Sequence, residues 1–151
     1  MKKTILCALL AAAFAAPAIA DNATLAVSAT VSGTCKFTTG TFTMAFGTLD
    51  PSTAANQTVT TALTYKCTKG QAATSFSFDT NATSPASVNI TNGTDNIPVS
   101  LAWTAPATVG TGFGVGSTPI SMNVVGDILA ASYANVSAGV YTKNVAVVVA
   151  P

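Results

Sequence analysis

The chain has 151 residues, of which 49% are hydrophobic and 7% are charged, and its formal net charge is +1. Its basic residues are all lysine, its acidic residues are all aspartate, and it contains no histidine. So few cations exclude an extended nucleic-acid surface, because such a surface must neutralise many phosphates. The lack of histidine excludes Ser-His-Asp and Cys-His nucleophiles and histidine-based zinc sites. The composition therefore predicts a single domain that is not an enzyme and that holds no metal and no small-molecule cofactor.

Residues 1–20 have the pattern of a secretory signal peptide. A pair of lysines precedes an apolar run over residues 5–16, and a small-x-small triplet closes the segment at residues 18–20. The apolar run is too short to span a bilayer. We therefore expect export to the periplasm and cleavage after Ala20, rather than a membrane anchor.

Two cysteines, Cys35 and Cys67, remain in the mature chain. An even pair of cysteines in an exported protein favours a disulfide, because the periplasm is oxidising. A metal site is the alternative, but two thiolates without histidine or a second cysteine pair rarely hold zinc. The predicted Cys35–Cys67 bridge would stabilise the fold by about 3–4 kcal/mol in the chain-entropy description.

Apolar and polar residues alternate along most of the mature chain, which is the pattern of strands with one buried face. Clusters of glycine, proline, asparagine and aspartate separate these stretches and predict turns, and a short helical turn is expected within residues 127–137. We therefore expect an all-β domain of about seven or eight strands, folded as an immunoglobulin-like β-sandwich. The predicted strands lie within residues 24–31, 41–46, 59–67, 76–78, 97–103, 120–124 and 141–149.

Three features resemble sites of chemistry, but each fits a structural role better. The five aspartates lie at strand ends or in turns, where they suit turn hydrogen bonds better than paired acid catalysis. The glycine-rich stretch 110–116 lacks the lysine and the helix of a phosphate loop. Trp103 shares a face with Val99 and Leu101, so we expect it in the core rather than, with Phe113, in a sugar-stacking patch.

The first alternating stretch, residues 24–31, lies close to the new N-terminus and is uncharged. Such a strand can be the first strand of its own sandwich. It can also be an extra strand that the sheet edge of a neighbouring chain accepts. The residues alone leave both readings open.

Four blocks of the mature chain resemble the spore coat protein U domain family, which includes subunits of archaic chaperone–usher pili. These blocks read LAVSATVSGTCKF (25–37), AFGTLDP (45–51), VTTALTYKCTKG (59–70) and AGVYTKNVAVVV (138–149). The resemblance implies an incomplete pilin sandwich, which a donor strand from a neighbouring subunit completes. It also implies a donor-strand extension at residues 21–31 and a pilin domain at residues 32–151.

The resemblance further implies a role for two sets of side chains. The donor strand would insert Leu25, Val27, Ala29 and Val31 into a neighbour. The acceptor edge, which the chaperone would bind first, would include Tyr141, Val145, Val147 and Val149.

The partners implied are copies of the chain or related pilins in a head-to-tail polymer, a periplasmic chaperone and an outer-membrane usher. The implied location is the periplasm in transit and then a surface pilus that contributes to adhesion and biofilm. The alternative is a monomeric secreted β-sandwich that closes its own sheet and binds a ligand such as a carbohydrate.

Overall fold

A computed structural model describes residues 21–53 and 55–151, so the predicted signal peptide lies outside the described residues. The chain divides into two units, Met1–Thr30 and Val31–Pro151. In the first unit, residues 21–30 are exposed and belong to no strand. We call residues 32–151, within the second unit, the body.

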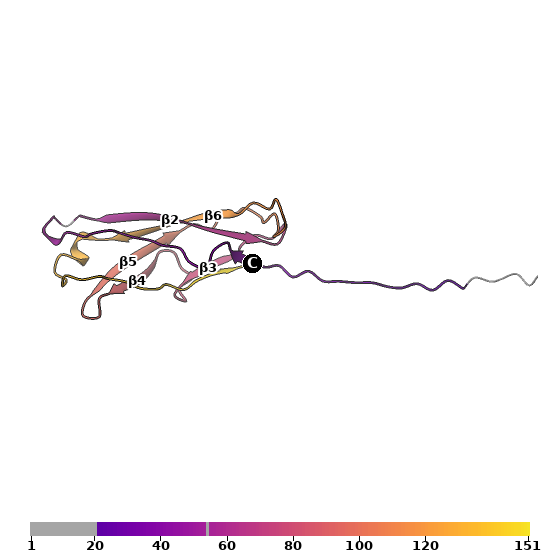
Figure 1. Cartoon of the computed structure of the whole chain (residues 1–151), viewed down its shortest axis with the longest axis horizontal. Coiled ribbons are helices and arrows are strands. Elements are labelled where there is room, and N and C mark those ends of the chain that lie inside the picture. Colours follow the sequence, from indigo (N-terminus) through magenta and orange to yellow (C-terminus); the bar gives the residue numbers. More distant parts are fainter. Residues whose placement is uncertain (1–20, 54) are drawn as a thin grey trace, which may run out of the picture. The chain divides into compact units, whose positions relative to one another are not determined.

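The body is an all-β sandwich of the immunoglobulin-like type, which confirms the predicted fold class. One sheet has the strand order β1-β2-β6-β5-β4 and the other pairs β3 with β7, and every pairing is antiparallel. Figure 1 shows β2 and β6 running side by side along the body, with the C-terminus near β3. The strands are β1 (Cys35–Phe37), β2 (Gln57–Cys67), β3 (Ser75–Phe78), β4 (Ala86–Thr91), β5 (Asn96–Trp103), β6 (Ile120–Ile128) and β7 (Val147–Ala150), and two 3-10 turns are η1 (Pro51–Thr53) and η2 (Ala130–Ser132).

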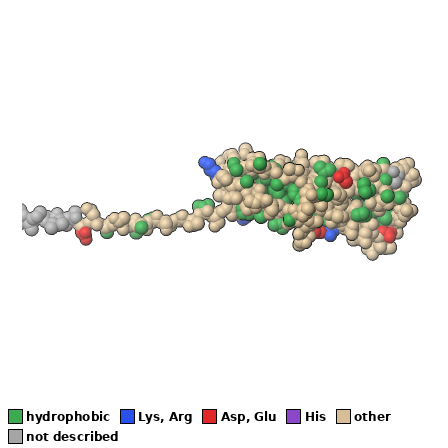
Figure 2. Space-filling view, turned by 180° about the vertical axis from the view of Figure 1, so that it is seen from behind, with side chains coloured by type: hydrophobic (Ala, Val, Ile, Leu, Met, Phe, Trp, Pro, Cys, Tyr) green, Lys and Arg blue, Asp and Glu red, His purple; other side chains and the backbone are tan. Residues whose placement is uncertain are grey.

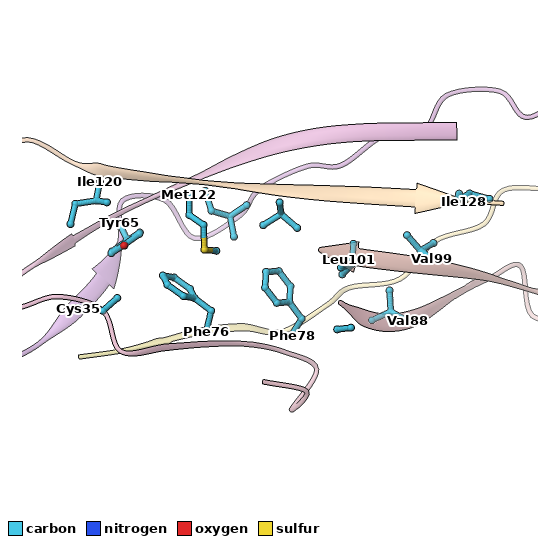
Figure 3. Packing of buried hydrophobic residues seen from close by; sticks show 14 of the residues in the cluster. Cys35, Tyr65, Phe76, Phe78, Val88, Val99, Leu101, Ile120, Met122 and Ile128 are labelled. Atoms are coloured by element: carbon cyan, nitrogen blue, oxygen red, sulfur yellow. The ribbon is translucent and has the colours of Figure 1, made fainter. Parts of the chain in front are cut away.

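The core lies between the two sheets. The longest ladder runs from Gln57 opposite Ile128 to Tyr65 opposite Ile120, and the inward residues of β2 and β6 alternate along it with outward polar ones. From the other sheet, Phe76 and Phe78 of β3 point toward Met122 (Figure 3). Alternation of period two therefore places a continuous apolar layer on the inner face of each sheet.

The predicted disulfide is confirmed, since Cys35 of β1 is bonded to Cys67 of β2. The two residues are directly opposite in the ladder, with their Cα atoms 4.1 Å apart. The neighbouring pair bonds through its backbone, since the N–H of Thr68 donates to the carbonyl of Thr34 at 2.9 Å. Cys35 and Cys67 therefore occupy a non-hydrogen-bonded pair, the kind that brings opposite side chains closest.

The observed strands differ from the predicted ones at several places. Strands β1 and β4 lie outside the predicted stretches, because β1 has three residues and β4 has only three inward apolar residues, Ala86, Val88 and Ile90. The alternating stretches 24–31 and 41–46, in contrast, form no strand, because no described strand pairs with their backbones. Only the end of the stretch 141–149 forms a strand, as β7. Alternation reports which side chains face the core, whereas a strand also requires a neighbouring backbone.

Two buried tyrosines differ in their hydrogen bonding. The hydroxyl of Tyr133 donates to the carbonyl of Ala55 at 2.6 Å and accepts from the N–H of Ala55 at 2.8 Å. The hydroxyl of Tyr65 is buried beside Phe76 and has no hydrogen-bond partner among the described residues. Desolvation of this hydroxyl raises the pKa of Tyr65 above its ordinary value.

Replacing each tyrosine by phenylalanine should therefore give opposite results in the mature chain. We expect Tyr133→Phe to lower the free energy of unfolding by about 1–2 kcal/mol, because it removes two hydrogen bonds. We expect Tyr65→Phe to leave that free energy unchanged or to raise it by up to about 1 kcal/mol, because no bond is lost. Urea denaturation of the two variants measures both values, and an equal loss in both would contradict the assignment.

Candidate functional site: an open strand edge and an apolar extension

The N-terminal extension, residues 21–31, carries alternating apolar side chains in an exposed segment. Leu25 is 85% exposed, Val27 84% and Val31 81%, and Ala29 is also exposed. The backbone of the extension makes no hydrogen bond to other described residues. A segment of this kind has apolar surface and main-chain groups available for another strand.

At the other end of the chain, four side chains of the C-terminal segment pack on the core. Tyr141, Val145, Val147 and Val149 are half-buried and lie against the hydrophobic cluster of the body. The residues between the valines, Ala146 and Val148, are exposed. The segment therefore presents one apolar face inward and leaves its other face to solvent.

Among the described residues, the backbone of β7 is hydrogen-bonded on one side only. The N–H of Asp79 donates to the carbonyl of Ala146 at 2.8 Å, and Ser77 is opposite Val148 in the ladder with β3. Because hydrogen-bonding direction alternates along an antiparallel strand, Ala146 and Val148 point their main-chain groups toward β3. Residues 145, 147 and 149 then point theirs away from β3, and no described strand pairs with β7 there. The main-chain groups of these valines form an open strand edge.

A second apolar strip packs against the same core from residues 41–49. Phe42, Met44 and Phe46 are half-buried and alternate with exposed residues, yet no backbone–backbone hydrogen bond holds this segment. Met44 and Phe46 lie over Gly126 of β6, where an added Cβ would collide with Met44 Sδ and approach Phe46 Cζ to 2.9 Å. The ends of the Met44 and Phe46 side chains therefore lie so close to the sheet at position 126 that a larger residue there would displace them.

Asp79, in the turn that follows β3, binds the C-terminal segment through a hydrogen bond and an ion pair. Its Oδ1 accepts the N–H of Ala146 at 2.8 Å, and its Oδ2 pairs with Lys143 Nζ at 2.7 Å. Asp79 and Thr80 form a two-residue turn with φ values of 47° and 72°, which non-glycine residues seldom adopt. The hydrogen bond from Lys143, followed by that from Ala146, lowers the pKa of Asp79 below its ordinary value.

The start of the C-terminal segment is held by a second polar cluster. The hydroxyl of Tyr141 donates to the carbonyl of Ser137 at 2.8 Å, and the N–H of Ser137 donates to Asp95 at 2.8 Å. Thr142 and Thr91 exchange backbone hydrogen bonds at 3.1 and 3.2 Å. Asp79 and Asp95 thus position the segment near both ends of its length.

These contacts offer main-chain pairing and apolar packing rather than a centre for catalysis. Within residues 21–53 and 55–151, no group of three or more metal-ligating side chains lies close enough to hold an ion. In the same part of the chain, no helix has the length and hydrophobicity needed to cross a membrane.

Comparison with known protein families matches residues 21–148 to the Spore Coat Protein U domain. The chain therefore belongs to the spore coat protein U domain family, a family of structural domains associated with the subunits of chaperone–usher pili. Pilus subunits of this family are exported surface proteins. Searches of curated proteins and of solved structures gave no match.

The structure groups the predicted residues into two sets. The four predicted acceptor residues share one inward face of the body, and the four predicted donor residues lie in the exposed extension.

Sequence reasoning missed the contribution of Met44, Gly126 and Asp79. The signal for Gly126 was a glycine inside a strand pattern, which often marks a close approach of other groups. No sequence pattern pointed to Asp79, because its partners are 64 and 67 residues away.

Asp79 should make stability depend on pH in a defined direction. Its pKa is lowered in the folded chain, so its contribution is present above the unfolded pKa of about 3.9 and is lost as the pH falls through the lower folded value. We expect Asp79→Asn to be less stable than the wild type at about pH 6, and the difference to shrink at about pH 2. Denaturation at the two pH values measures this difference, and a constant difference would contradict the role of the carboxylate.

Proposed function

We propose that this chain is a structural subunit of a surface pilus that polymerises by strand donation through a chaperone–usher pathway. The extension of one copy pairs with the open edge of β7 in the next copy. The observation that carries the proposal is the coexistence, in one protein, of an unpaired alternating extension and an open strand edge lined by half-buried valines.

The lengths and spacings of the two segments agree. Residues 22–31 and residues 141–150 each span about 33 Å as extended chain at about 3.3 Å per residue. Leu25, Val27, Ala29 and Val31 recur at every second position, as do Val145, Val147 and Val149 on the acceptor. A donated strand in register can therefore direct all of its apolar side chains to the core while its backbone completes the ladder.

The free energy of such pairing has an identifiable source. Burying a leucine or valine side chain contributes about 1.5–3 kcal/mol. Leu25, Val27 and Val31 are exposed over more than four-fifths of their surface in the free chain, so nearly all of that contribution is available. Because donor and acceptor are different surfaces, the contact is heterologous and continues as a fibre instead of closing a dimer.

An open edge beside apolar side chains is prone to aggregate before assembly. A periplasmic chaperone that covers this edge, and an outer-membrane usher that exchanges it for the next extension, meet that physical requirement. The family match starts at residue 21, the first residue after the predicted cleavage site, which supports passage through the periplasm. At the cell surface, the fibre would serve adhesion and biofilm formation.

Deleting residues 22–31 tests strand donation directly. We expect fibres sheared from producing cells to give a ladder on a denaturing gel without boiling and a single band after boiling, since the subunits are not covalently linked. The truncated chain should give no ladder by itself, and it should shorten the ladder when produced beside the full chain, because it accepts a strand but donates none. Long fibres from the truncated chain alone would contradict the proposal. A single monomer band from the full chain in both lanes would favour the self-closing module.

A matched pair of substitutions tests which face of the extension enters the acceptor. Val27→Asp should abolish the ladder, because it would bury a charge without a partner. Ser28→Asp adds the same charge one residue later, on the opposite face of the strand, and should leave the ladder intact. Equal ladders from both variants would contradict insertion of the Leu25–Val31 face.

A further inference from the structure

The two ends of the body carry exposed apolar side chains and charges of opposite sign, and the proposed strand donation does not involve these groups. Strand β6 crosses the body from Ile120 to Ile128, a length of about 25–30 Å at about 3.3 Å per residue. We call the end at Ile120 the loop end, which comprises the turn 68–72 and the loop 110–119. We call the other end the turn end, which comprises the turn 92–95, Leu129 and residues 137–140.

The loop end presents apolar side chains on an anchored loop. Phe113 is 49% exposed and Val115 is exposed as well. The base of the loop is held against the disulfide, since the N–H of Gly112 donates to the carbonyl of Cys67 at 3.1 Å, and a Cβ at Gly110 would collide with that carbonyl. The loop therefore lies beside Cys67, and hence beside Cys35, close to where the extension joins the body.

The turn end presents a second, separate pair of exposed apolar side chains. Leu129 is 60% exposed and Val140 is 81% exposed. Gly139, next to Val140, lies against the side chain of Asn92, and Tyr141 is fastened to Ser137. Both ends of the body therefore display apolar groups on segments that are held in place by hydrogen bonds or close packing.

The charges of the body are divided between the same two ends. Lys36, Lys66 and Lys69 lie at the loop end, whereas Asp50, Asp95 and Asp127 lie at the turn end. The remaining charged residues of the body, Lys143 and Asp79, pair with each other. On the face drawn in Figure 2, lysine atoms mark one end of the body, and carboxylates lie in the other half and beside one lysine near the middle.

The lysines at the loop end lack an acidic partner within the described chain. Lys36 of β1 is directly opposite Lys66 of β2, an arrangement of like charges that is unfavourable in a ladder. Lys66 Nζ donates to the hydroxyl of Ser117 at 2.9 Å, and the single ion pair of the described residues is Lys143–Asp79. Carboxylates brought from outside would relieve this repulsion.

We propose that consecutive copies of this chain also bind through their ends, with the loop end of one body on the turn end of the next. Phe113 and Val115 pack against Leu129 and Val140 of that next copy, and lysines face aspartates around this apolar centre. This inference rests on the proposed strand donation and adds a second contact to it. The opposite charges and the separated apolar pairs identify a second copy of the chain as the occupant.

The short connection between extension and body supports this arrangement. The four Cα–Cα steps from Val31, at the end of the donor strand, to Cys35 of β1 span at most about 14 Å, so the donating body must lie against the end of its neighbour. A strand that pairs antiparallel with β7 finishes near Tyr141, at the turn end. The loop end of the donating body, which begins beside residue 35, then meets the turn end of the accepting body.

Paired cysteine substitutions in the full chain test the contact. The first pair is Val115→Cys with Val140→Cys, and the second is Phe113→Cys with Leu129→Cys. The two members of each pair are separated by the length of β6 within one copy, beyond the Cα separation of about 7 Å that a disulfide tolerates, so any bridge must join two copies. The control pair is Val115→Cys with Asn123→Cys, because Asn123 is exposed in the middle of β6.

Mild oxidation of sheared fibres gives the readout on a denaturing gel after boiling without reductant. We expect at least one test pair to give a ladder that survives boiling and disappears with reductant, and the control pair to give none. If every variant forms the heat-sensitive ladder but no test pair exceeds the control after boiling, strand donation stands and the end-to-end contact is wrong. If the wild type forms no heat-sensitive ladder, the proposed function fails, and this inference fails with it.

Discussion

Strand β7 has hydrogen-bonding groups on two sides, and within the described chain only the side that faces β3 is paired. Main-chain groups and side chains both alternate in direction along a strand. Val145, Val147 and Val149 therefore place their side chains against the core and also carry the main-chain groups that are not paired with β3. Core packing and the open edge therefore both depend on the same segment. Hydrogen bonds to Asp79 and Asp95 hold the C-terminal segment in place although one edge of β7 is open.

Residues 41–49 form a second apolar segment that packs on the core without belonging to a strand. Among the described residues its backbone makes no backbone–backbone hydrogen bond. It is held by side-chain packing on the core and by the hydroxyl of Thr61, which donates to the carbonyl of Thr43 at 3.2 Å. Gly126 lets Met44 and Phe46 approach the sheet closely, and a methionine adapts its shape to an irregular space. Residues 41–49 and the C-terminal segment that ends in β7 do not pair with each other. A donated strand that paired with both would join them into one sheet.

Much of the fold was predictable from alternation, because period two in residues 59–67, 97–103 and 120–124 depends only on local sequence. The Cys35–Cys67 bridge was predictable because only two cysteines lie outside the predicted signal peptide. Whether residues 24–31 and 41–46 form strands was not predictable, because strand formation depends on a backbone partner that local sequence does not specify. Asp79 shows the same limit, since its side chain acts on Lys143 and Ala146, which lie far away in the sequence. The acceptor residues were placed by family resemblance, and the structure adds the direction of their main-chain groups.

The few charged residues of the body lie mainly at its two ends. With Lys143 and Asp79 neutralising each other, the sides of the body carry threonine, serine, alanine and asparagine, and the six unpaired charges are left at the two ends. Side-to-side association between copies therefore gains little from electrostatics, whereas end-to-end approach in one orientation is attractive and the reverse orientation is repulsive. In the proposed polymer, a donated strand would fix which ends meet, and the charges at those ends would favour the same polarity.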